Sequence, residues 1–403
     1  MWKPSASTPG NSRSELIGQL NLPLQTMTLD SVRATGALDK SLLAVIRSVE
    51  AVPLRFPLEP PFRAAVRVID SVDVVLLRIR DGDGREGLGL AFAFGSADAR
   101  PILEVARTLG ASRVGRDAAT IERHWLEMRQ LLGLAGAGGP AIAALSAIDM
   151  ALWDLFGRIS GQPLWRLLGG VRERIATYGS GGSLALSTEE LVRESASFVE
   201  AGHRAIKIKA GHGVTGDLER VSAVRECVGP GVRIAVDGNQ QWRPKAAIRW
   251  ARELEPLDIW WLEEPVRAGD FAGHAEVRAG VSMDVATGET LFGVDDAVRC
   301  IQQRATDILM PNLQRIGGIT GWRKIAAFAE LSDFSMAAHV YPEVHAHLMC
   351  ATPNAMALEL WPDWPWLWTE PLLIEEGHAK PPAGPGLGLT LDEPRVQAYR
   401  VDA

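Results

Sequence analysis

Cysteine is scarce in this sequence, with three residues in 403, and this scarcity narrows the classes of protein to consider. Cys227, Cys300 and Cys350 lie far apart and no CxxC pair occurs, so neither a zinc ribbon nor a disulfide framework is expected. An odd number of cysteines suits a reducing compartment. The first residues, MWKPSASTPG, lack the apolar segment of a secretory signal. We therefore expect a cytoplasmic protein.

An excess of basic charge and long apolar runs are also missing. Lysine and arginine total 42 against 49 aspartate and glutamate residues, which gives a net charge of −7, and no basic cluster stands out. Nucleic acid and anionic membranes are therefore not expected as partners. No apolar stretch of about 18 residues is evident, so we expect no transmembrane helix. A composition of 47% hydrophobic and 23% charged residues excludes a disordered, collagen-like or coiled-coil chain.

The chain divides into regions of different pattern. Residues 1–40 are rich in Ser, Thr, Pro and Gly, which predicts a flexible N-terminal tail or, alternatively, an arm that orders against a partner subunit. Residues 41–170 show strand patterns and then helical patterns, so we expect an α+β domain, which residues from about 370 to 403 rejoin. Within it, DGDGREG at 81–87 spells GxGxxG, but no helix follows. A hairpin turn is therefore expected there rather than a dinucleotide-binding loop.

A strand-then-helix pattern recurs through residues 171–369. The strand candidates are RIATYGS, HRAIKIKA, VRIAVDGN, DIWWLEEP, MDVATGE, TDILMPN, FSMAAHV and AMALELW. Eight such units predict an α/β fold with a modified (β/α)8 barrel of the TIM type, in which the eighth helix is reduced or replaced.

The active site of such a barrel lies at the C-terminal ends of its strands. Ionisable and amide side chains occur at this position in strand after strand: Lys207, Lys209, Asp237, Asn239, Glu263, Glu264, Glu289, Asn312, His339 and Glu359. Chance surface charges do not explain this recurrence. Asp237, Glu263 and Glu289 follow one another at intervals of 26 residues, one strand–helix unit each. Three converging carboxylates repel unless a cation lies between them, and oxygen ligands suit Mg²⁺ first and Mn²⁺ second.

The basic side chains suggest acid–base chemistry. Lys207 and Lys209 are two residues apart on one strand and therefore face the same way. We expect each ammonium to destabilise the other and to lower a lysine pKa toward a value useful for a base. His339 ends a strand across the barrel and is expected to act as an acid or base. His345 and His347 point apart on the following helix and are expected to be structural.

These motifs in order resemble the mandelate racemase branch of the enolase superfamily. The matching segments are KIK at 207–209, VDGN at 236–239, WLEEP at 261–265, TGE at 287–289, MPNLQRIGGITGW at 310–322, AAHV at 337–340 and LEL at 358–360. The resemblance implies that Asp237, Glu263 and Glu289 bind Mg²⁺, and that Lys209 and His339 are acid–base groups on opposite faces of a carboxylate substrate. It also implies a homo-oligomer.

The same resemblance implies how the substrate is held. Lys207 would lie near the substrate carboxylate, and Glu359 would hydrogen-bond to it, which demands a raised pKa for Glu359. Asn239 is a further candidate for substrate binding. The capping loop is expected around Arg55 to Arg63, so Arg55 is a candidate for substrate contact. Other candidates are Ser180 and Ser183 of YGSGGSL, although this glycine-rich segment could equally form only a turn.

Asn312 departs from the pattern of the branch, in which the histidine is paired with an aspartate. We expect the amide oxygen of Asn312 to accept the Nδ1 hydrogen of His339, without the negative charge that favours an imidazolium. Lys209 would then take the α-proton, and His339 would be a weaker acid or have no acid–base role.

The resemblance leaves the reaction open. We favour Mg²⁺-dependent removal of the proton α to a carboxylate, through an enediolate, in a sugar-acid (2-hydroxy carboxylate) dehydratase. The alternative is a racemase or epimerase of a 2-hydroxy acid, which the Trp-rich segment WPDWPWLWTEP would favour if it lined an apolar pocket. A pseudoenzyme that binds Mg²⁺ and a carboxylate is a third hypothesis, and a metal-dependent hydrolase a fourth.

Overall fold

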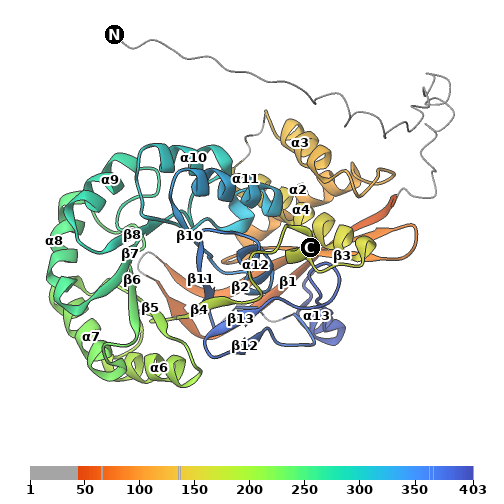
Figure 1. The fold of residues 1–403 in the computed structure, drawn as a ribbon. Helices are drawn as coiled ribbons and strands as arrows, with labels where there is room; N and C mark the ends of the chain where they lie inside the picture. Colours follow the sequence, from red (N-terminus) through yellow and green to blue (C-terminus); the bar gives the residue numbers. More distant parts are fainter. Residues whose placement is uncertain are drawn as a thin grey trace, which may run out of the picture. The chain divides into compact units, whose positions relative to one another are not determined.

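Figure 1 shows the computed structural model, which describes residues 44–64, 67–134, 136, 138–362, 364–365 and 367–402. The N-terminal segment expected to be a tail, residues 1–40, lies outside the described residues. The first elements form a three-stranded antiparallel sheet of β1 (Ile46–Arg63), β2 (Val68–Asp81) and β3 (Glu86–Ala93), with β2 in the middle. The turn between β2 and β3 contains DGDG, which confirms the predicted hairpin and excludes a dinucleotide-binding loop there.

Helices α2 (Ser96–Ala111) and α4 (Gly139–Ser160) pack against this sheet, and α3 (Ile121–Leu131) packs against α4. Helix α4 lies so close to β3 that a Cβ at Gly89 would meet the Ala147 carbonyl oxygen at 2.0 Å, so only glycine permits this packing. Helix α4 ends at Gly161, whose φ of 65° is the left-handed conformation that commonly closes a helix.

Helix α4 is also long and apolar enough to cross a membrane by length and composition, so the expectation that no such stretch exists is wrong. However, 78% of its apolar window is buried within the protein. Asp149 of this helix accepts hydrogen bonds from Thr320 N at 2.9 Å and Thr320 Oγ1 at 2.6 Å. Asp154 accepts from Leu88 N at 2.8 Å and Leu387 N at 2.7 Å. Helix α4 therefore connects the N-terminal sheet to later parts of the chain, as a core helix does.

The eight predicted strands are present and form a closed parallel barrel. They are β4 (Ile175–Ser180), β5 (Ala205–Lys209), β6 (Arg233–Asp237), β7 (Ile259–Glu263), β8 (Asp284–Thr287), β9 (Ile308–Leu309), β10 (Ser335–Ala337) and β11 (Ala355–Leu360). Pairing of β11 with β4 closes the barrel. The structure thus confirms a modified TIM barrel with an N-terminal α+β domain (Figure 1).

Helices separate successive barrel strands on the outside of the barrel. After the short α5 (Leu164–Leu167), these are α6 (Thr188–Glu200), α7 (Gly213–Val228), α8 (Pro244–Leu254), α9 (Phe271–Gly280), α10 (Gly293–Gln302), α11 (Gly318–Leu331) and α12 (Pro342–Cys350), with 3₁₀ turns η2 (Glu255–Leu257) and η3 (Leu313–Arg315). In the described chain after β11, a hairpin of β12 (Leu373–Glu375) and β13 (His378–Lys380) takes the place of an eighth helix, and β13 pairs antiparallel with β4.

The C-terminal residues then return to the N-terminal sheet. Helix α13 (Glu393–Tyr399) packs against β1, where Tyr399 stacks on Phe56 with ring centroids 4.4 Å apart. Arg78 of β2 forms an ion pair with Glu393 at 2.6 Å. The last part of the chain therefore contacts both the barrel strand β4 and the N-terminal sheet.

The barrel interior explains why charged groups gather at one end. In the part of the barrel interior that lies farther from the carboxyl ends of the strands, small side chains surround Tyr178 and Trp261. These small residues are Ala205, Ala235, Ala286, Ala337 and Ala357. Alternate residues of a strand point to the same side, so the next inward positions toward the carboxyl ends are Lys207, Asp237, Glu263 and Glu359. The apolar core thus ends directly beneath a layer of charged groups.

Candidate active site

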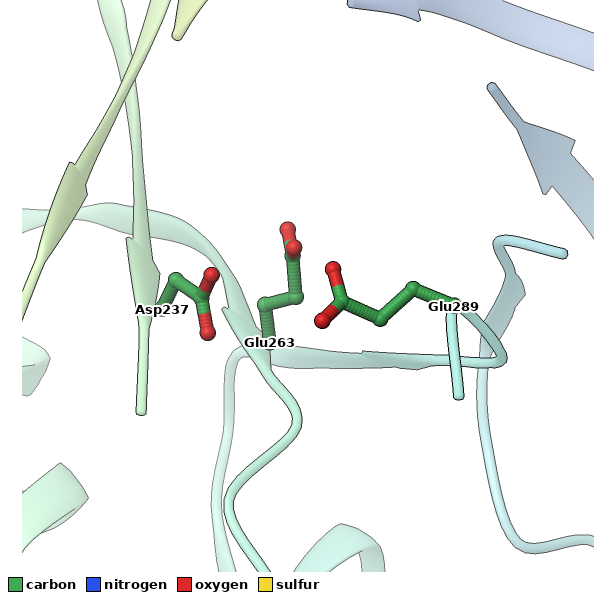
Figure 2. A group of neighbouring side chains, drawn as sticks. All are labelled: Asp237, Glu263 and Glu289. Carbon is green, nitrogen blue, oxygen red and sulfur yellow. The ribbon is translucent and has the colours of Figure 1, made fainter. Parts of the chain in front are cut away.

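Three carboxylates from neighbouring strands converge above this core. Asp237 ends β6, Glu263 ends β7 and Glu289 follows β8, and one oxygen of each lies within 4.8 Å of the others (Figure 2). Asp237 and Glu263 have no exposed surface. Burial, together with Asp237 and Glu289 and against the effect of Lys207, raises the pKa of Glu263 well above its usual range.

The donor set fits a hard divalent cation. In addition to the three carboxylates, Asn239 Oδ1 and Glu264 Oε2 are buried oxygen atoms without a hydrogen-bond partner in the part of the chain that the structure describes. The other oxygen of Glu264 is held by Thr287 Oγ1 at 2.5 Å and Gly288 N at 3.1 Å. Carboxylate and amide oxygens without nitrogen or sulfur ligands are typical of Mg²⁺ and Mn²⁺ sites.

Both lysines of β5 are paired with carboxylates. Lys207 Nζ lies 2.6 Å from Glu263 Oε1 and 2.8 Å from Glu359 Oε1, and Lys209 Nζ forms an ion pair with Asp237. Burial alone would lower the pKa of each lysine, but these carboxylates raise it, well above the usual range for Lys207. The prediction that the two ammonium groups lower each other's pKa is therefore wrong for this arrangement. Each ammonium is paired with a carboxylate, and attraction to the carboxylates outweighs the repulsion between the lysines.

Glu359 is the second-last residue of β11 and is held by three donors. Ser180 Oγ donates to Glu359 Oε1 at 2.7 Å, Val340 N donates to Oε2 at 2.7 Å, and Lys207 completes the set. Burial opposes its charge, but Lys207, His339 and Ser180 lower the pKa of Glu359 to about 2. The expected raised pKa of Glu359 is thus also wrong here, since the carboxylate is buried among donors rather than among other carboxylates.

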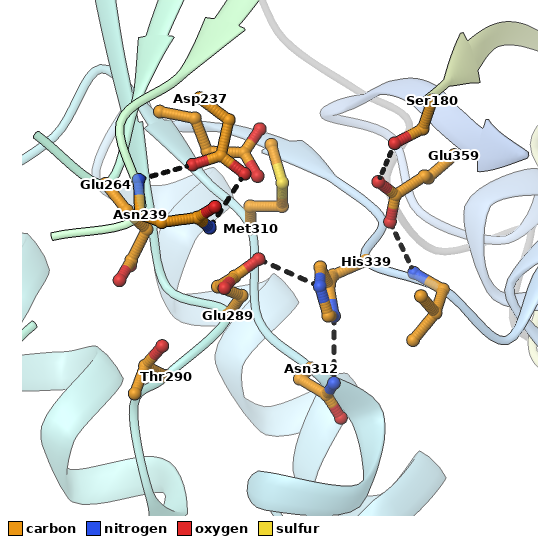
Figure 3. A network of polar contacts seen from close by, with 12 residues as sticks. Ser180, Asp237, Asn239, Glu264, Glu289, Thr290, Met310, Asn312, His339 and Glu359 are labelled. Atoms are coloured by element: carbon orange, nitrogen blue, oxygen red, sulfur yellow. Dashed lines mark hydrogen bonds and ion pairs between the residues drawn. The ribbon is translucent and has the colours of Figure 1, made fainter. Parts of the chain in front are cut away.

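His339 lies between Glu289 and Asn312 (Figure 3). Its Nε2 is 2.8 Å from Glu289 Oε2, and its Nδ1 is 2.8 Å from Asn312 Nδ2. Asn312 Oδ1 accepts a hydrogen bond from Gln314 N at 3.1 Å. A backbone N–H can only donate, so it orients the amide with its NH₂ group toward the ring. The expected contact from Nδ1–H to the amide oxygen is therefore reversed: Asn312 donates to Nδ1, and Nε2–H donates to Glu289.

Gln314, which no motif in the sequence indicated as a site residue, holds this region to the N-terminal sheet. Its Oε1 accepts from Phe92 N at 2.8 Å, and its Nε2 donates to Phe92 O at 3.0 Å. Tyr341 donates its hydroxyl hydrogen to the same Oε1 at 2.7 Å. Gln314 stood within the matching segment MPNLQRIGG, but its partner Phe92 is 222 residues away, so no local pattern indicated the contact.

A cavity of about 440 Å³ opens above the carboxylates. Six of the predicted site residues line it: Ser180, Lys209, Asn239, Glu289, His339 and Glu359. Three more lie beneath the cavity: Lys207, Asp237 and Glu263. They contact the residues that line the cavity or one another. Asn312 contacts His339, which lines the cavity. The structure thus brings together ten of the twelve predicted site residues.

Ser183 and Arg55 are placed elsewhere. Ser183 Oγ accepts from Arg63 N at 3.0 Å, so it holds the end of β1 to the glycine-rich segment after β4. Arg55 donates to both oxygens of Asp73 at 2.9 and 2.8 Å, on the adjacent strand. The stretch from Arg55 to Arg63 is strand rather than loop, and the described residues that cover the cavity come from its end and the following turn: Phe62, Ala64 and Arg67.

His345, His347 and most of the described residues of the Trp-rich segment hold parts of the protein together and do not line the cavity. His345 Nδ1 contacts Val340 O at 2.6 Å, and His347 lies between Trp165 N and Leu387 O at 3.3 and 3.0 Å. In the Trp-rich segment, Trp361 lines the cavity, whereas Trp364 and Trp368 are buried in the core.

Comparison with known sequences shows the family. Residues 46–169 match the family described as mandelate racemase / muconate lactonizing enzyme, N-terminal domain, and residues 190–395 match the enolase C-terminal domain-like family. The chain belongs to the mandelate racemase / muconate lactonizing enzyme family. This family combines a barrel and an N-terminal domain in the order described above.

Relatives within the family carry out several reactions. A 3,6-anhydro-alpha-L-galactonate cycloisomerase of Streptomyces coelicolor is 34% identical over 80% of this chain and 90% of its own length. An L-talarate/galactarate dehydratase of Salmonella typhimurium is 33% identical over 81% of this chain and 82% of its own length. A solved racemase from Streptomyces coelicolor with bound magnesium is 32% identical, with a TM-score of 0.86 over 89% of this chain and all of that chain.

Proposed function

We propose that this protein is a Mg²⁺-dependent enzyme that removes the proton α to a carboxylate and dehydrates a sugar acid through an enediolate. The observation that carries the proposal is the cluster of three carboxylates, from three successive strands, beside Lys209 at the floor of the cavity. The magnesium in the solved racemase and the activity of the Salmonella dehydratase support it.

Asp237, Glu263 and Glu289 would hold the cation, with Mn²⁺ as the second choice. A bound Mg²⁺ supplies positive charge beside the substrate carboxylate, which stabilises the charge that develops on it. Asn239 donates hydrogen bonds of 2.8 and 3.1 Å to Asp237 from its backbone N–H and its side-chain amide (Figure 3). Its Oδ1 has no partner among the described residues and is available to the cation or to the substrate.

Lys209 is the proposed base, because it lines the cavity and is the lysine with one carboxylate partner rather than two. To act, its amine must leave Asp237 without its proton. Lys209 Nζ then takes the proton from C2, and the electron pair of the C2–H bond forms a C1–C2 double bond, so that the carboxylate becomes an enediolate. When the enediolate collapses, the carboxylate re-forms, the electron pair forms the C2–C3 double bond, and the C3–O bond breaks. The departing hydroxyl takes the proton from Lys209 and leaves as water, and the enol becomes a 2-keto-3-deoxy acid without net oxidation or reduction.

Lys207 and Glu359 would act on the substrate carboxylate. The Lys207 ammonium is fixed between Glu263 and Glu359, so it is a preorganised cation directly beneath the cavity. Glu359 positions Lys207 and Ser180, and it would need to take up a proton before it could donate to a substrate oxygen.

The alternative, a racemase or epimerase, needs a second base on the opposite face of the substrate. His339 lies on that side, but with Asn312 donating to Nδ1, its Nε2 carries the hydrogen and has no lone pair to accept a proton. The orientation of Asn312 therefore favours dehydration with one base, in which His339 is a neutral hydrogen-bond donor.

The test is to incubate the protein with Mg²⁺ in D₂O and a panel of sugar and 2-hydroxy acids and to follow the α-proton by NMR. A 2-keto-3-deoxy product is expected, and Lys209→Ala should lower its rate by about 10²- to 10⁴-fold without loss of Mg²⁺ binding. Exchange of the α-proton with the carbon skeleton intact would instead indicate racemisation. Silence across the panel despite Mg²⁺ binding would indicate a pseudoenzyme.

We also propose a division into a capping domain of residues 41–170, rejoined by about 370–403, and a catalytic barrel of residues 171–369. The packing of α13 against β1 and the closure of β11 on β4 support it. We further propose a cytoplasmic homo-oligomer without nucleic-acid or membrane partners. The three free cysteines support a reducing compartment, and light scattering on the purified protein would measure the oligomeric state.

A further inference from the structure

The chain turns directly after His339, through two residues in the left-handed conformation. Val340 has a φ of 47°, and Tyr341 has a φ of 52° and a ψ of 46°. Among the residues that the structure describes, Val340 is the only β-branched residue with a positive φ. A β-branched side chain strongly disfavours this conformation, so it persists only where the surrounding contacts enforce it. Residues 339–341, which we call the strained segment, are therefore held in shape by their neighbours.

The strained segment carries two contacts of the candidate active site. The Val340 N–H donates to Glu359 Oε2 at 2.7 Å, and His339 Nε2 lies 2.8 Å from Glu289 Oε2. The φ and ψ angles set the direction of each peptide plane, so relaxation of Val340 to a common conformation would turn this N–H away from Glu359. The left-handed conformation thus aims a backbone donor at a carboxylate that lines the cavity.

The side chain of Tyr341 fixes the strained segment to the N-terminal sheet. It is fully buried, and its hydroxyl donates to Gln314 Oε1 at 2.7 Å, with Leu90 O as a second acceptor at 3.4 Å. Its ring packs against those of Phe92 and Trp364, with centroids 5.6 and 5.0 Å away. Both acceptors belong to β3 or are bound to it, because Leu90 is a residue of β3 and Gln314 pairs with the backbone of Phe92.

These contacts form a closed ring around the histidine. Gln314 binds the Tyr341 hydroxyl through its side chain, and its backbone N–H donates to Asn312 Oδ1 at 3.1 Å. Asn312 in turn donates to His339 Nδ1 at 2.8 Å, and His339 is followed by Val340 and Tyr341 in the chain. The histidine is thus held in two ways, through its ring by Asn312 and through the backbone by Tyr341.

We propose that Tyr341 is a positioning residue, whose hydroxyl holds Val340 in the left-handed conformation and thereby keeps the His339 ring and the Val340 N–H in the geometry that the reaction uses. Tyr341 does not line the cavity, so it acts through its neighbours. The inference rests on the proposed function for the parts that His339 and Glu359 play. It goes further in making their geometry depend on a contact with the N-terminal sheet.

The first experiment removes the hydroxyl and keeps the ring. In Tyr341→Phe, we expect kcat with an acid that the wild type dehydrates to fall by about 10-fold and KM to change less, because small displacements of reacting groups reduce the rate. Thr306→Val is the matched control, since it removes a buried hydroxyl that donates to Val285 O and Ile308 O, at the end of β9 away from Asn312. An unchanged kcat in Tyr341→Phe, or an equal fall in both variants, would overturn the inference.

A double-variant cycle tests whether the hydroxyl acts through the backbone of Val340. Glycine adopts a φ of 47° readily, so the strained segment needs less support after Val340→Gly. The factor by which Tyr341→Phe lowers kcat should therefore be about threefold smaller in the Val340→Gly background. Comparison within each background cancels the direct effect of Val340, which lines the cavity. Equal factors in the two backgrounds would contradict the inference.

Hydrogen exchange separates this inference from the proposed reaction, because it requires no turnover. The Val340 N–H is bonded to Glu359, so it exchanges slowly while the strained segment is held. Mass spectrometry of a peptide spanning residues 338–341 should show exchange about 10-fold faster in Tyr341→Phe and unchanged in Thr306→Val. Unchanged exchange in Tyr341→Phe would overturn the inference. Faster exchange in a protein that dehydrates no acid would support the holding role of Tyr341 and contradict the proposed reaction alone.

Discussion

The two lysines of β5 have different partners, although they lie two residues apart. Lys207 is held by two carboxylates and has 1% exposed surface, whereas Lys209 pairs with Asp237 alone and faces the cavity. The difference follows from depth in the barrel, because Lys207 is one inward position closer to the core. The sequence predicted that both would face inward, but their distinct environments depend on Glu263, Glu359 and Asp237 from other strands.

The contact of Asn312 with His339 leads to a prediction on pH dependence. Asn312→Asp replaces the NH₂ group that donates to Nδ1 with a carboxylate that can only accept, so Nδ1 must carry a hydrogen and the shape of the pH profile of kcat/KM should change. Rates measured from pH 5 to 9 on the wild type and the variant test this. Asn354→Asp, a substitution outside the cavity, controls for added charge. An unchanged Asn312→Asp profile would show that His339 has no protonation-dependent role.

At the scale of elements, η3 connects the N-terminal sheet to the active site. Gln314 binds Phe92, and Arg315 Nη1 donates to the carbonyl oxygen of Glu289 at 2.6 Å. Asn312 at the start of the same turn contacts His339. This one short turn thus contacts Phe92 of the N-terminal sheet, a proposed metal ligand and the histidine.

We therefore expect Gln314→Met to have two effects. It leaves the backbone groups of Phe92 unpaired in a buried site, which should cost about 1–3 kcal/mol of unfolding free energy. It should also raise KM more than it lowers kcat, because Phe92 lines the cavity. Urea unfolding and steady-state kinetics measure these changes. Gln302→Met, at an exposed position of α10, should change neither. Loss of stability with an unchanged KM would contradict the connection to substrate binding.

Helix α4 carries a second contact between elements, and this contact depends on pH. Burial raises the pKa of Asp149 to about 7, even though Thr320 donates two hydrogen bonds to it. An acid with a raised pKa in the folded state binds its proton more tightly there than in the unfolded chain. Its contribution to stability is therefore present at low pH and is lost as the pH rises from about 4 toward about 7.

We expect Asp149→Asn to remove this dependence. The wild type should lose more unfolding free energy than the variant when the pH is raised from 5 to 7.5, because the variant has no proton to release. Urea unfolding of both proteins at the two pH values gives the comparison. Equal losses in both proteins would mean that Asp149 does not titrate in this range.

At the scale of the whole molecule, the carboxylate cluster couples metal binding to folding. Its three ligands come from β6, β7 and the residues after β8, so the site exists only in the folded barrel. A ligand that binds only the folded state stabilises it, by about 2.7 kcal/mol at a concentration 100 times its dissociation constant.

Mg²⁺ should accordingly raise the melting temperature in a concentration-dependent manner, and EDTA should reverse the effect. Asp237→Asn should weaken the Mg²⁺-dependent shift, because one ligand charge is lost. Asp258→Asn, at the other end of the same βα unit, is a control that should keep the full shift. A melting temperature that does not respond to Mg²⁺ would contradict the proposed metal site.

The barrel and the positions of most site residues could be predicted from local patterns in the sequence. Alternation of apolar runs with amphipathic stretches is a local pattern, and a polar residue at the end of such a run must lie at the carboxyl edge of the sheet. This reasoning placed Asp237, Glu263 and Glu289 at one end of the barrel before their distances were known.

How the charged groups are paired, and which side chains cover them, depends instead on the three-dimensional packing of the chain. The pKa directions of Lys209 and Glu359 depend on donors and acceptors from other strands, and the orientation of the Asn312 amide depends on the turn that follows it. Phe62 contacts Trp361 beside the cavity, although the two residues lie 299 positions apart in the sequence. Electrostatic and packing interactions act over a few ångströms in space, and no periodic pattern along the chain records which distant residues come within that range.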